Sequence, residues 1–303
     1  LCQVSGCSMV SAYLEPDVAA GVFGDPRAIL AWGPGPDGRA VAVDGGYRVS
    51  GTWSFASGSR HATWLGAHCA IHEAGGAVRD PAGRIMLFPA ARATMLDVWN
   101  VIGLRGTGSD SYTVTDLFVP RAFTVARDAE AERRHPGAVY CFTTNSIYAS
   151  GFAGLALGVA RRMLEAFVAL ARDKTPRGHR QALRDSATVQ SQTARAEVRL
   201  AAARTFLLAT LEDVWRAVGR ARAMSLAQRV RIRLAATHAV HEATAVADFT
   251  YHAAGATAIF LGSAFERRFR DIHTVSQQIQ GRTSHYETVG RFMFGLEPDT
   301  LFM

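Results

Sequence analysis

The period of the hydrophobic pattern changes once along this 303-residue chain, near residue 135. Before that point, short runs alternate between apolar and polar residues and are separated by turns rich in glycine and proline. After it, apolar residues recur mostly every three or four positions over long stretches, which is typical of helices. We therefore predict an α+β fold, with an antiparallel β-barrel or sandwich domain followed by an all-α helical bundle domain.

The pattern predicts at least five strands and four or five long helices. The predicted strands lie in RAVAV (39–43), YRVSGTWSF (47–55), TWLGAHCAI (63–71), RIMLFPA (84–90) and SYTVTDLFVP (111–120). The predicted helices carry apolar stripes over 147–170, 198–218 and 226–249, with two more over about 263–278 and 283–294. The predicted domains are 1–25, the end of a further helical segment; 26–125, the β domain; and 136–303, the bundle.

Composition narrows the class of protein. The chain is 49% hydrophobic, which allows one large core or two moderate ones, but it has no apolar run of about 18 residues that could span a bilayer. Its first residues lack the basic start of a signal peptide. The four cysteines show neither a CxxC motif nor metal-ligand spacing. We therefore expect reduced thiols in a cytoplasmic protein without a metal site.

The net charge of +7 comes almost entirely from arginine. The arginines are spread through the helical segments, and no aromatic–basic interleaving of the RNA-binding kind is present. A surface that receives a phosphate-bearing small molecule fits this pattern better than a nucleic-acid groove. An ordinary solvated face explains it equally well.

Two segments of the β half resemble the middle β domain of the acyl-CoA dehydrogenase superfamily. They are DGGYRVSGTWSFASGSRHATW (44–64) and WNVIGLRGTGSDSYTVTDLFVP (99–120). Three later segments, ARAEVRLAAAR (194–204), YHAAGATAIF (251–260) and FERRFRDIHT (265–274), resemble the C-terminal helical domain of that superfamily. The resemblance covers about residues 10–303 and implies the superfamily's fold. Residues 1–20 would be the end of its N-terminal helical domain, most of which is not in this sequence.

The resemblance implies a flavin site between the β domain and the C-terminal helices. Phe55 matches the aromatic residue near the flavin ring, and Ser57 matches a hydroxyl residue at its reactive edge. Trp32 and the backbone of Gly33, in AWGPG, would face the flavin pyrimidine. Arg177 would reach the cofactor's phosphates across a subunit interface. A hydroxyl and an aromatic residue two positions apart on a strand point to the same side, which suits a planar ring.

The stretch FRDIHTVSQQIQGRTSHYE determines which branch of the superfamily the chain resembles. Superfamily members that oxidise acyl-CoA thioesters use a glutamate base, often in this region, because removal of a weakly acidic proton needs a positioned carboxylate. No Asp or Glu lies between Asp271 and Glu287. The stretch is instead similar to the oxygenase components of two-component flavin-dependent monooxygenases, which hydroxylate aromatic and related small substrates. We expect Ser57, His273, Ser276, Gln277 and Gln278 to line the flavin, and Thr274 to be a further cofactor-binding residue.

Gln278 departs from the monooxygenase pattern, in which a histidine commonly stands at about this position. Glutamine can donate a hydrogen bond but does not titrate near neutral pH. His273 or His285 substitutes, or the substrate needs no base, or activity has been lost. A helix histidine bonded to a backbone carbonyl remains an alternative for His273, and a surface position is expected for His285. The predicted catalytic residues are Ser57, His273 and Gln278.

The favoured function is therefore the oxygenase component of a monooxygenase that uses reduced flavin, FAD or FMN, with O2. The resemblance implies a separate flavin reductase as partner and a homodimer or homotetramer, without nucleic acid or membrane. Two alternatives remain. One is an acyl-CoA dehydrogenase acting on a thioester. The other is a truncated, inactive homologue that persists as an oligomeric interaction protein.

Overall fold

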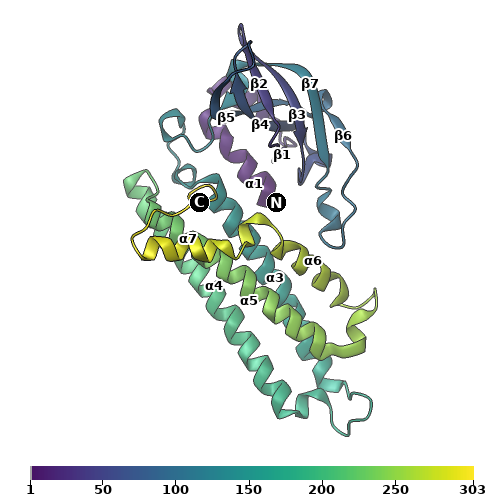
Figure 1. Ribbon diagram of the computed structural model, residues 1–303. Coiled ribbons are helices and arrows are strands. Elements are labelled where there is room, and N and C mark those ends of the chain that lie inside the picture. Colours follow the sequence, from purple (N-terminus) through teal and green to yellow (C-terminus); the bar gives the residue numbers. More distant parts are fainter. Residues whose placement is uncertain (1) are drawn as a thin grey trace. The chain divides into compact units, whose positions relative to one another are not determined.

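The computed structural model describes residues 2–303, apart from the side chains of residues 81 and 82, and divides into two compact units. The first comprises the described residues up to Asn100 together with Arg105–Thr144, and the second comprises Val101–Leu104 and Asn145–Met303. Figure 1 shows a sheet with short helices in the first unit and long helices in the second. The predicted α+β class is confirmed.

The sheet of the first unit has eight strands in the order β6-β7-β3-β2-β4-β5-β8, with β1 also paired to β4. The strands are β1 (Leu30–Gly33), β2 (Arg39–Val43), β3 (Gly46–Trp53), β4 (Trp64–His72), β5 (Val78–Pro89), β6 (Thr94–Leu96), β7 (Ser111–Pro120) and β8 (Thr124–Val125). Most neighbours are antiparallel, but β1 and β2 both run parallel to β4. The sheet is therefore mixed, whereas the sequence pattern predicted an antiparallel one.

The parallel pairing has a simple local origin, because β1 and β2 follow one another along β4. Leu30 pairs with Trp64 and Arg39 with Ala70, and the turn 34–38 interrupts the strand between them. The side chain of Trp53 fills this turn. A Cβ at Gly35 would lie only 2.2 Å from the Trp53 indole, so the turn requires glycine there. The AWGPG segment is thus a short buried strand followed by a turn around Trp53.

Three short N-terminal helices belong to the same unit as the sheet. They are α1 (Cys2–Ser8), the 3-10 helix Met9–Tyr13 and α2 (Pro16–Phe23). Cys7, Val10 and Val22 share a core cluster with Leu30 and Leu87 of the sheet. The amide of Gln3 also donates to the carbonyl of Trp32 at 3.0 Å. These helices therefore stabilise the strand that precedes the AWGPG turn.

The second unit is built on five α-helices, and side-chain caps mark the start of two of them. They are α3 (Thr144–Asp173), α4 (Ala187–Ala221), α5 (Leu226–Ala254), α6 (Glu266–Ser276) and α7 (Ser284–Met293). α4 begins after Ser186, whose hydroxyl accepts from the amide of Val189. α5 begins with a capping box formed by Ser225 and Gln228. None of the helices in the described residues is long and apolar enough to cross a membrane.

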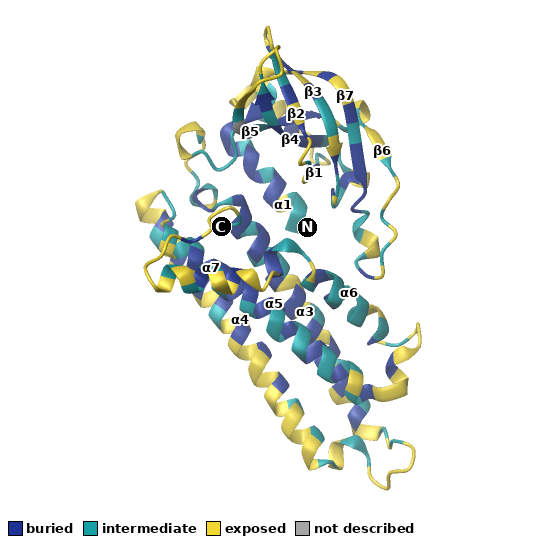
Figure 2. Cartoon of the chain, viewed as in Figure 1, coloured by how far each residue is buried: buried dark blue, intermediate teal, exposed yellow. Residues whose placement is uncertain are grey.

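α4 carries two apolar stripes on different faces. Figure 2 shows that part of α4 is buried and that much of the rest of this helix is exposed. The stripe buried in the bundle comprises Ala196, Leu200, Ala203, Leu207, Thr210, Val214 and Val218. The second stripe is exposed: Val198 by 66%, Leu208 by 44% and Trp215 by 50%. The helix was predicted correctly, but most of the residues that indicated it do not face its own core.

Candidate functional site

Phe55 sits in an unusual backbone conformation directly after β3. Its φ angle is 54°, in the left-handed region that bulky residues rarely adopt, and its side chain is 64% exposed. The end of β1 crosses this segment closely: a Cβ at Gly33 would lie 1.8 Å from the carbonyl oxygen of Ser54. Gly33 is therefore required for the backbone that presents Phe55. A strained, exposed aromatic residue of this kind is a candidate ligand contact.

Ser57 belongs to a chain of hydroxyl groups. Its Oγ lies 2.6 Å from Oγ of the buried Ser109, which lies 2.7 Å from Oγ1 of Thr107. The backbone amide of Gly58 also donates to the carbonyl of Thr107. The segments FASGS and GTGSD, far apart in the sequence, are thus joined side by side within the first unit, with the half-buried Ser57 at one end of the chain of hydroxyls.

The buried side chain of Asp110 fixes the backbone of the same region through hydrogen bonds. Its side chain is almost completely buried, and Oδ1 accepts hydrogen bonds of 3.0 Å from the backbone amides of both Val98 and Trp99. Oδ2 accepts from Nε of Arg60. The Arg60 guanidinium, together with those amides, holds the pKa of this carboxyl below its usual range. The indole of Trp99 in turn meets the Phe55 ring edge to face, with ring centroids 6.1 Å apart.

Trp32 has a different environment from that expected for a flavin contact. Its indole is 2% exposed and packs edge to face against His68 in the core of the first unit. Burial lowers the pKa of His68 to about 3, so this imidazole is neutral. The indole of Trp32 therefore has a structural place in the core. Of the AWGPG residues, the backbone of Gly33 remains the candidate for a ligand contact.

In the second unit, the segment 101–104 is bonded to α6. The amide of Leu104 donates to Oδ1 of Asp271 at 2.7 Å, and Nη1 of Arg270 donates to the carbonyl of Ile102. Gly103 lies against the α6 backbone, because a Cβ there would be 2.2 Å from the carbonyl oxygen of Arg270. The carboxylate of the FRDIH motif therefore holds the IGLRG segment in place.

His273 has a carboxylate partner instead of a backbone carbonyl. Its Nε2 lies 2.8 Å from Oδ1 of Asp248 on α5, and the two side chains are 34% and 41% exposed. The imidazole also contacts Phe269 edge to face, and Phe269 stacks on Tyr251 with centroids 4.0 Å apart. The carboxylate orients the imidazole, which is the arrangement of a positioned base. Asp248 was not identified from the sequence.

The polar residues that follow His273 are largely bonded to their own segment. Oγ1 of Thr274 donates to the carbonyl of Arg270, and Oγ of Ser276 donates to that of His273. Gln277 is exposed at the end of α6. Oε1 of Gln278 accepts the backbone amide of Gln280 at 2.6 Å and so caps the next turn. Of this set, Gln277 has the most exposed side chain, while Gln278 has a defined structural contact.

Side chains of α5 and α7 fix the turn after Gln278 by binding three consecutive carbonyl groups. His285 bonds to the carbonyl of Ile279 at 2.8 Å, Arg233 to that of Gln280 at 3.2 Å and His241 to that of Gly281 at 3.0 Å. The expected surface position of His285 was wrong, because this residue is 6% exposed. Burial, with a smaller effect of Arg233, lowers the pKa of His285. His285 therefore supports the turn and is not a solvent-facing base.

Arg177 lies exposed in the loop after α3. Lys174, the only lysine of the chain, anchors this loop by donating to the carbonyl of Ala254 and to Oγ1 of Thr257. The phosphate-binding role of Arg177 stays a prediction.

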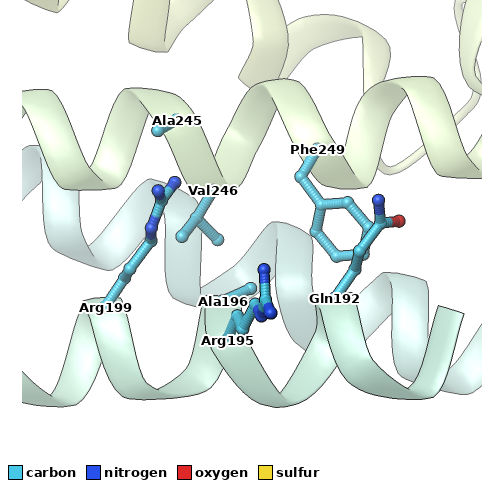
Figure 3. Close-up of a pocket in the computed structure, with 7 residues that line it drawn as sticks. All are labelled: Gln192, Arg195, Ala196, Arg199, Ala245, Val246 and Phe249. Atoms are coloured by element: carbon cyan, nitrogen blue, oxygen red, sulfur yellow. The ribbon is translucent and has the colours of Figure 1, made fainter. Parts of the chain in front are cut away.

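A pocket of about 220 Å³ opens between α4 and α5 (Figure 3). It is lined by Gln192, Arg195, Ala196, Arg199, Ala245, Val246 and Phe249. Arg199 is paired with Glu242 at 3.4 Å. None of the predicted site residues lines this pocket. Within residues 2–303, no group of three or more His, Cys, Asp or Glu side chains could hold a metal ion, and all four cysteines are free thiols.

The structure thus brings the predicted residues together in two groups. Phe55, Ser57 and the Gly33 backbone meet in the first unit, and His273, Thr274 and Gln278 lie along one segment of the second. The expectation that the two groups share one flavin site stays a prediction. Sequence reasoning missed Trp99, Asp110 and Asp248. Trp99 and Asp110 lie in the segment 99–120, which was one basis of the family resemblance, so this segment was the sequence signal that could have identified them.

The comparisons with known proteins agree with this architecture. Residues 150–281 match the family model described as Acyl-CoA dehydrogenase, C-terminal domain. The chain is 28% identical over 288 residues to the indole-3-acetate monooxygenase of Pseudomonas putida, covering 95% of this chain and 73% of that protein. It is 27% identical over 294 residues to the FADH(2)-dependent resorcinol hydroxylase, oxygenase component, of Rhizobium sp., covering 90% and 70%.

Among solved structures, XiaF from Streptomyces sp., in complex with FADH2 and glycerol, matches with a TM-score of 0.91 at 25% identity, over 99% of this chain and 77% of that one. The predicted resemblance to the acyl-CoA dehydrogenase superfamily is confirmed. Within it, several relatives are named as the oxygenase component or subunit of a flavin-dependent enzyme. The chain is therefore an oxidoreductase of the flavin-dependent monooxygenase class, as predicted.

Proposed function

We propose that this protein hydroxylates a small aromatic compound, using O2 and a reduced flavin that a separate reductase supplies. The observation that carries the proposal is the pair of Phe55 and Ser57: an exposed aromatic ring in a left-handed backbone conformation, two residues from a hydroxyl at the end of a hydroxyl chain. The aromatic substrates and FADH2 named for the relatives support the substrate class and the choice of FAD.

The residues present fit a flavin. Gly33 leaves room only for backbone beneath Ser54, so Phe55 is held outward as a flat apolar surface. Such a surface suits a planar conjugated ring. Ser57 supplies a hydroxyl donor beside it. A reduced flavin, when bound, supplies the electrons with which O2 is activated for transfer of one oxygen atom to the substrate.

The chain of hydroxyl groups can fix the direction in which the Ser57 hydroxyl donates its hydrogen bond. If Oγ of Thr107 donates to Ser109, and Ser109 to Ser57, the hydrogen of the Ser57 hydroxyl is left to donate to a ring nitrogen or oxygen. Hydrogen bonds in such a chain polarise one another and strengthen the terminal donor. We assign Ser57 this donor role, and His273, oriented by Asp248, the role of proton acceptor from the substrate.

The alternative activity, oxidation of an acyl-CoA thioester, lacks its base in this segment. Asp271 accepts the amide of Leu104 and thereby holds the 101–104 segment. No carboxylate lies between Asp271 and Glu287, which is in the first turn of α7. These observations support hydroxylation over α,β-dehydrogenation and leave Asp271 a structural role.

We further propose that the protein is a cytoplasmic homodimer or homotetramer. The exposed stripe of α4 supports assembly, because Val198, Leu208 and Trp215 leave apolar area that a second copy would cover. Free thiols suit a reducing compartment. Sedimentation velocity on wild type and on a Leu208→Arg variant tests the assembly: the wild type should sediment as an oligomer and the variant as a smaller species.

The activity is tested by mixing the full chain with chemically reduced FAD, ¹⁸O2 and phenolic or indolic acids, including resorcinol and indole-3-acetate. We expect a hydroxylated product that carries one ¹⁸O atom and that is absent without the protein. A parallel reaction with an acyl-CoA and an artificial electron acceptor tests the dehydrogenase alternative. Acyl-CoA oxidation without any labelled aromatic product would overturn the proposal.

A further inference from the structure

We propose that Asp110 is a positioning residue that holds Trp99 against Phe55, and that the two rings together form a rigid aromatic wall for a planar conjugated ring. The inference rests on the proposed function and adds two residues to it. The chemistry of the ligand is shared by the flavin and by an aromatic substrate, and the experiment below separates the two.

Asp110 accepts hydrogen bonds from the backbone segments that carry the two rings of the wall. Its carboxylate accepts the amides of Val98 and Trp99, each at 3.0 Å, which fixes the backbone that carries the indole. Its own carbonyl accepts the amide of Ala56 at 3.0 Å, next to Phe55. One buried residue therefore sets the positions of two segments more than forty residues apart in the sequence.

Both oxygens of the buried Asp110 carboxylate accept hydrogen bonds, so this side chain is held in one position. Arg60 donates to Oδ2 through Nε and also pairs with the exposed Asp97 at 2.5 Å. Charge-assisted bonds to a carboxylate that is only 2% exposed resist displacement by water.

The ring geometry is suited to a ligand. The planes of Phe55 and Trp99 are 83° apart, so the two rings form a corner and do not cover one another face to face. Phe55 remains mostly exposed, and Val98, next to Trp99, is exposed as well. A planar ring placed in such a corner stacks on one aromatic face and meets the edge of the other.

The test measures binding, which does not depend on turnover. Oxidised FAD and, separately, resorcinol and indole-3-acetate are titrated into the full chain by calorimetry. Trp99→Ala should weaken binding of the wall's ligand about two- to tenfold, while Trp99→Phe, which keeps an aromatic ring, should lose less.

Asp110→Ala should resemble Trp99→Ala, and Asp110→Asn, which retains an oxygen for the two amides, should recover much of the loss. Asp97→Asn is the control: it removes a second partner of Arg60 but is 88% exposed at the side chain and should bind as wild type.

Two further readings decide between positioning and simple stability. If Asp110 acts through Trp99, the double variant Asp110→Ala/Trp99→Ala should bind no more weakly than Trp99→Ala alone. A loss confined to FAD assigns the wall to the flavin, and a loss confined to the aromatic acids assigns it to the substrate. Unchanged affinity of Trp99→Ala for all of these ligands would overturn the inference, even if Asp110→Ala fails to fold. Weakened FAD binding in a protein that hydroxylates nothing would instead refute the proposed function and keep the wall.

Discussion

Asp271 accepts a hydrogen bond of 2.7 Å from the backbone amide of Leu104, a residue 167 positions earlier in the chain. This contact explains why a carboxylate stands at the start of the FRDIH stretch although none follows in the loop. The side chain holds the IGLRG segment on α6 and is occupied in doing so. The same contact makes the fit of Gly103 against α6 a point where the second unit should be sensitive to substitution.

Gly103→Ala should destabilise the second unit. The added Cβ would lie 2.2 Å from the carbonyl oxygen of Arg270 and 2.5 Å from Oγ1 of Thr274, and helix backbone cannot move aside easily. Overpacking of this kind costs about 1–3 kcal/mol in free energy of unfolding. Gly106→Ala is the matched control, because nothing lies within 4 Å of its Cβ position, and it should change stability by less than about 0.5 kcal/mol. Urea unfolding measures both, and equal midpoints would contradict the close packing.

Arg233→Ala should loosen the turn 279–281. The guanidinium donates to the carbonyls of Gln280 and Phe302 from a position that is 1% exposed. Its removal leaves buried carbonyl groups without donors, which costs more than the loss of an exposed contact. Hydrogen exchange at the amides of residues 279–281 should become faster. Arg231→Ala is the control: its ion pair with Asp213 is about half exposed and should contribute little. Unaltered exchange in the Arg233 variant would show that the turn is held by other contacts.

His285 should make the stability of the second unit depend on pH in the weakly acidic range. Burial, then the charge of Arg233, lowers the pKa of this imidazole in the folded protein relative to the unfolded chain. The folded state therefore binds fewer protons, so the stability from neutral His285 is complete above its unfolded pKa of about 6.5 and is lost as pH falls through the folded value. His285→Gln keeps a donor for the carbonyl of Ile279 and cannot titrate. Thermal unfolding between pH 7 and pH 4 should show a smaller loss of stability for this variant than for wild type; identical pH profiles would argue against the assignment.

The sequence predicted the regular elements well where one face alone is buried. RAVAV and SYTVTDLFVP coincide with β2 and β7, because alternation reports directly which side of a strand is covered. β1 escaped prediction because four consecutive buried residues show no alternation and run into a proline-containing turn. On α4, two stripes of similar spacing stand on different faces, and periodicity alone cannot tell which of them the bundle buries.

For the candidate site, local pattern predicted less. Phe55 and Ser57 were found because a family-like motif contains them, and their exposure and hydroxyl partners agree with a site. The contributions of Asp110, Trp99 and Asp248 depend on contacts between distant segments, to which no local spacing corresponds. The surface position predicted for His285 was wrong because this residue is buried against Arg233 and the turn after Gln278. These contacts join distant segments, and without them a histidine at the start of a helix is expected to be exposed.

Gln278 offers the sharpest test of the proposed chemistry, because its side chain has a structural task that a glutamate can also perform. Oε1 accepts the amide of Gln280 at 2.6 Å, and the carboxylate of Gln278→Glu, equal in length, should preserve this cap. Gln278→Met, which has no comparable acceptor, controls for loss of the turn. We expect Gln278→Glu to unfold at nearly the wild-type temperature, to hydroxylate more slowly and to release more H2O2, because a negative charge disfavours the build-up of anionic oxygen beside it.

Gln278→His should instead add a group that titrates between about pH 5 and 8 and hence a new pH dependence of hydroxylation. The measurements are product formation with reduced FAD, peroxide release and acyl-CoA oxidation. Acyl-CoA oxidation by Gln278→Glu would show that the enzyme accepts thioesters and would favour the dehydrogenase alternative, whereas unchanged hydroxylation in all three variants would remove Gln278 from the site.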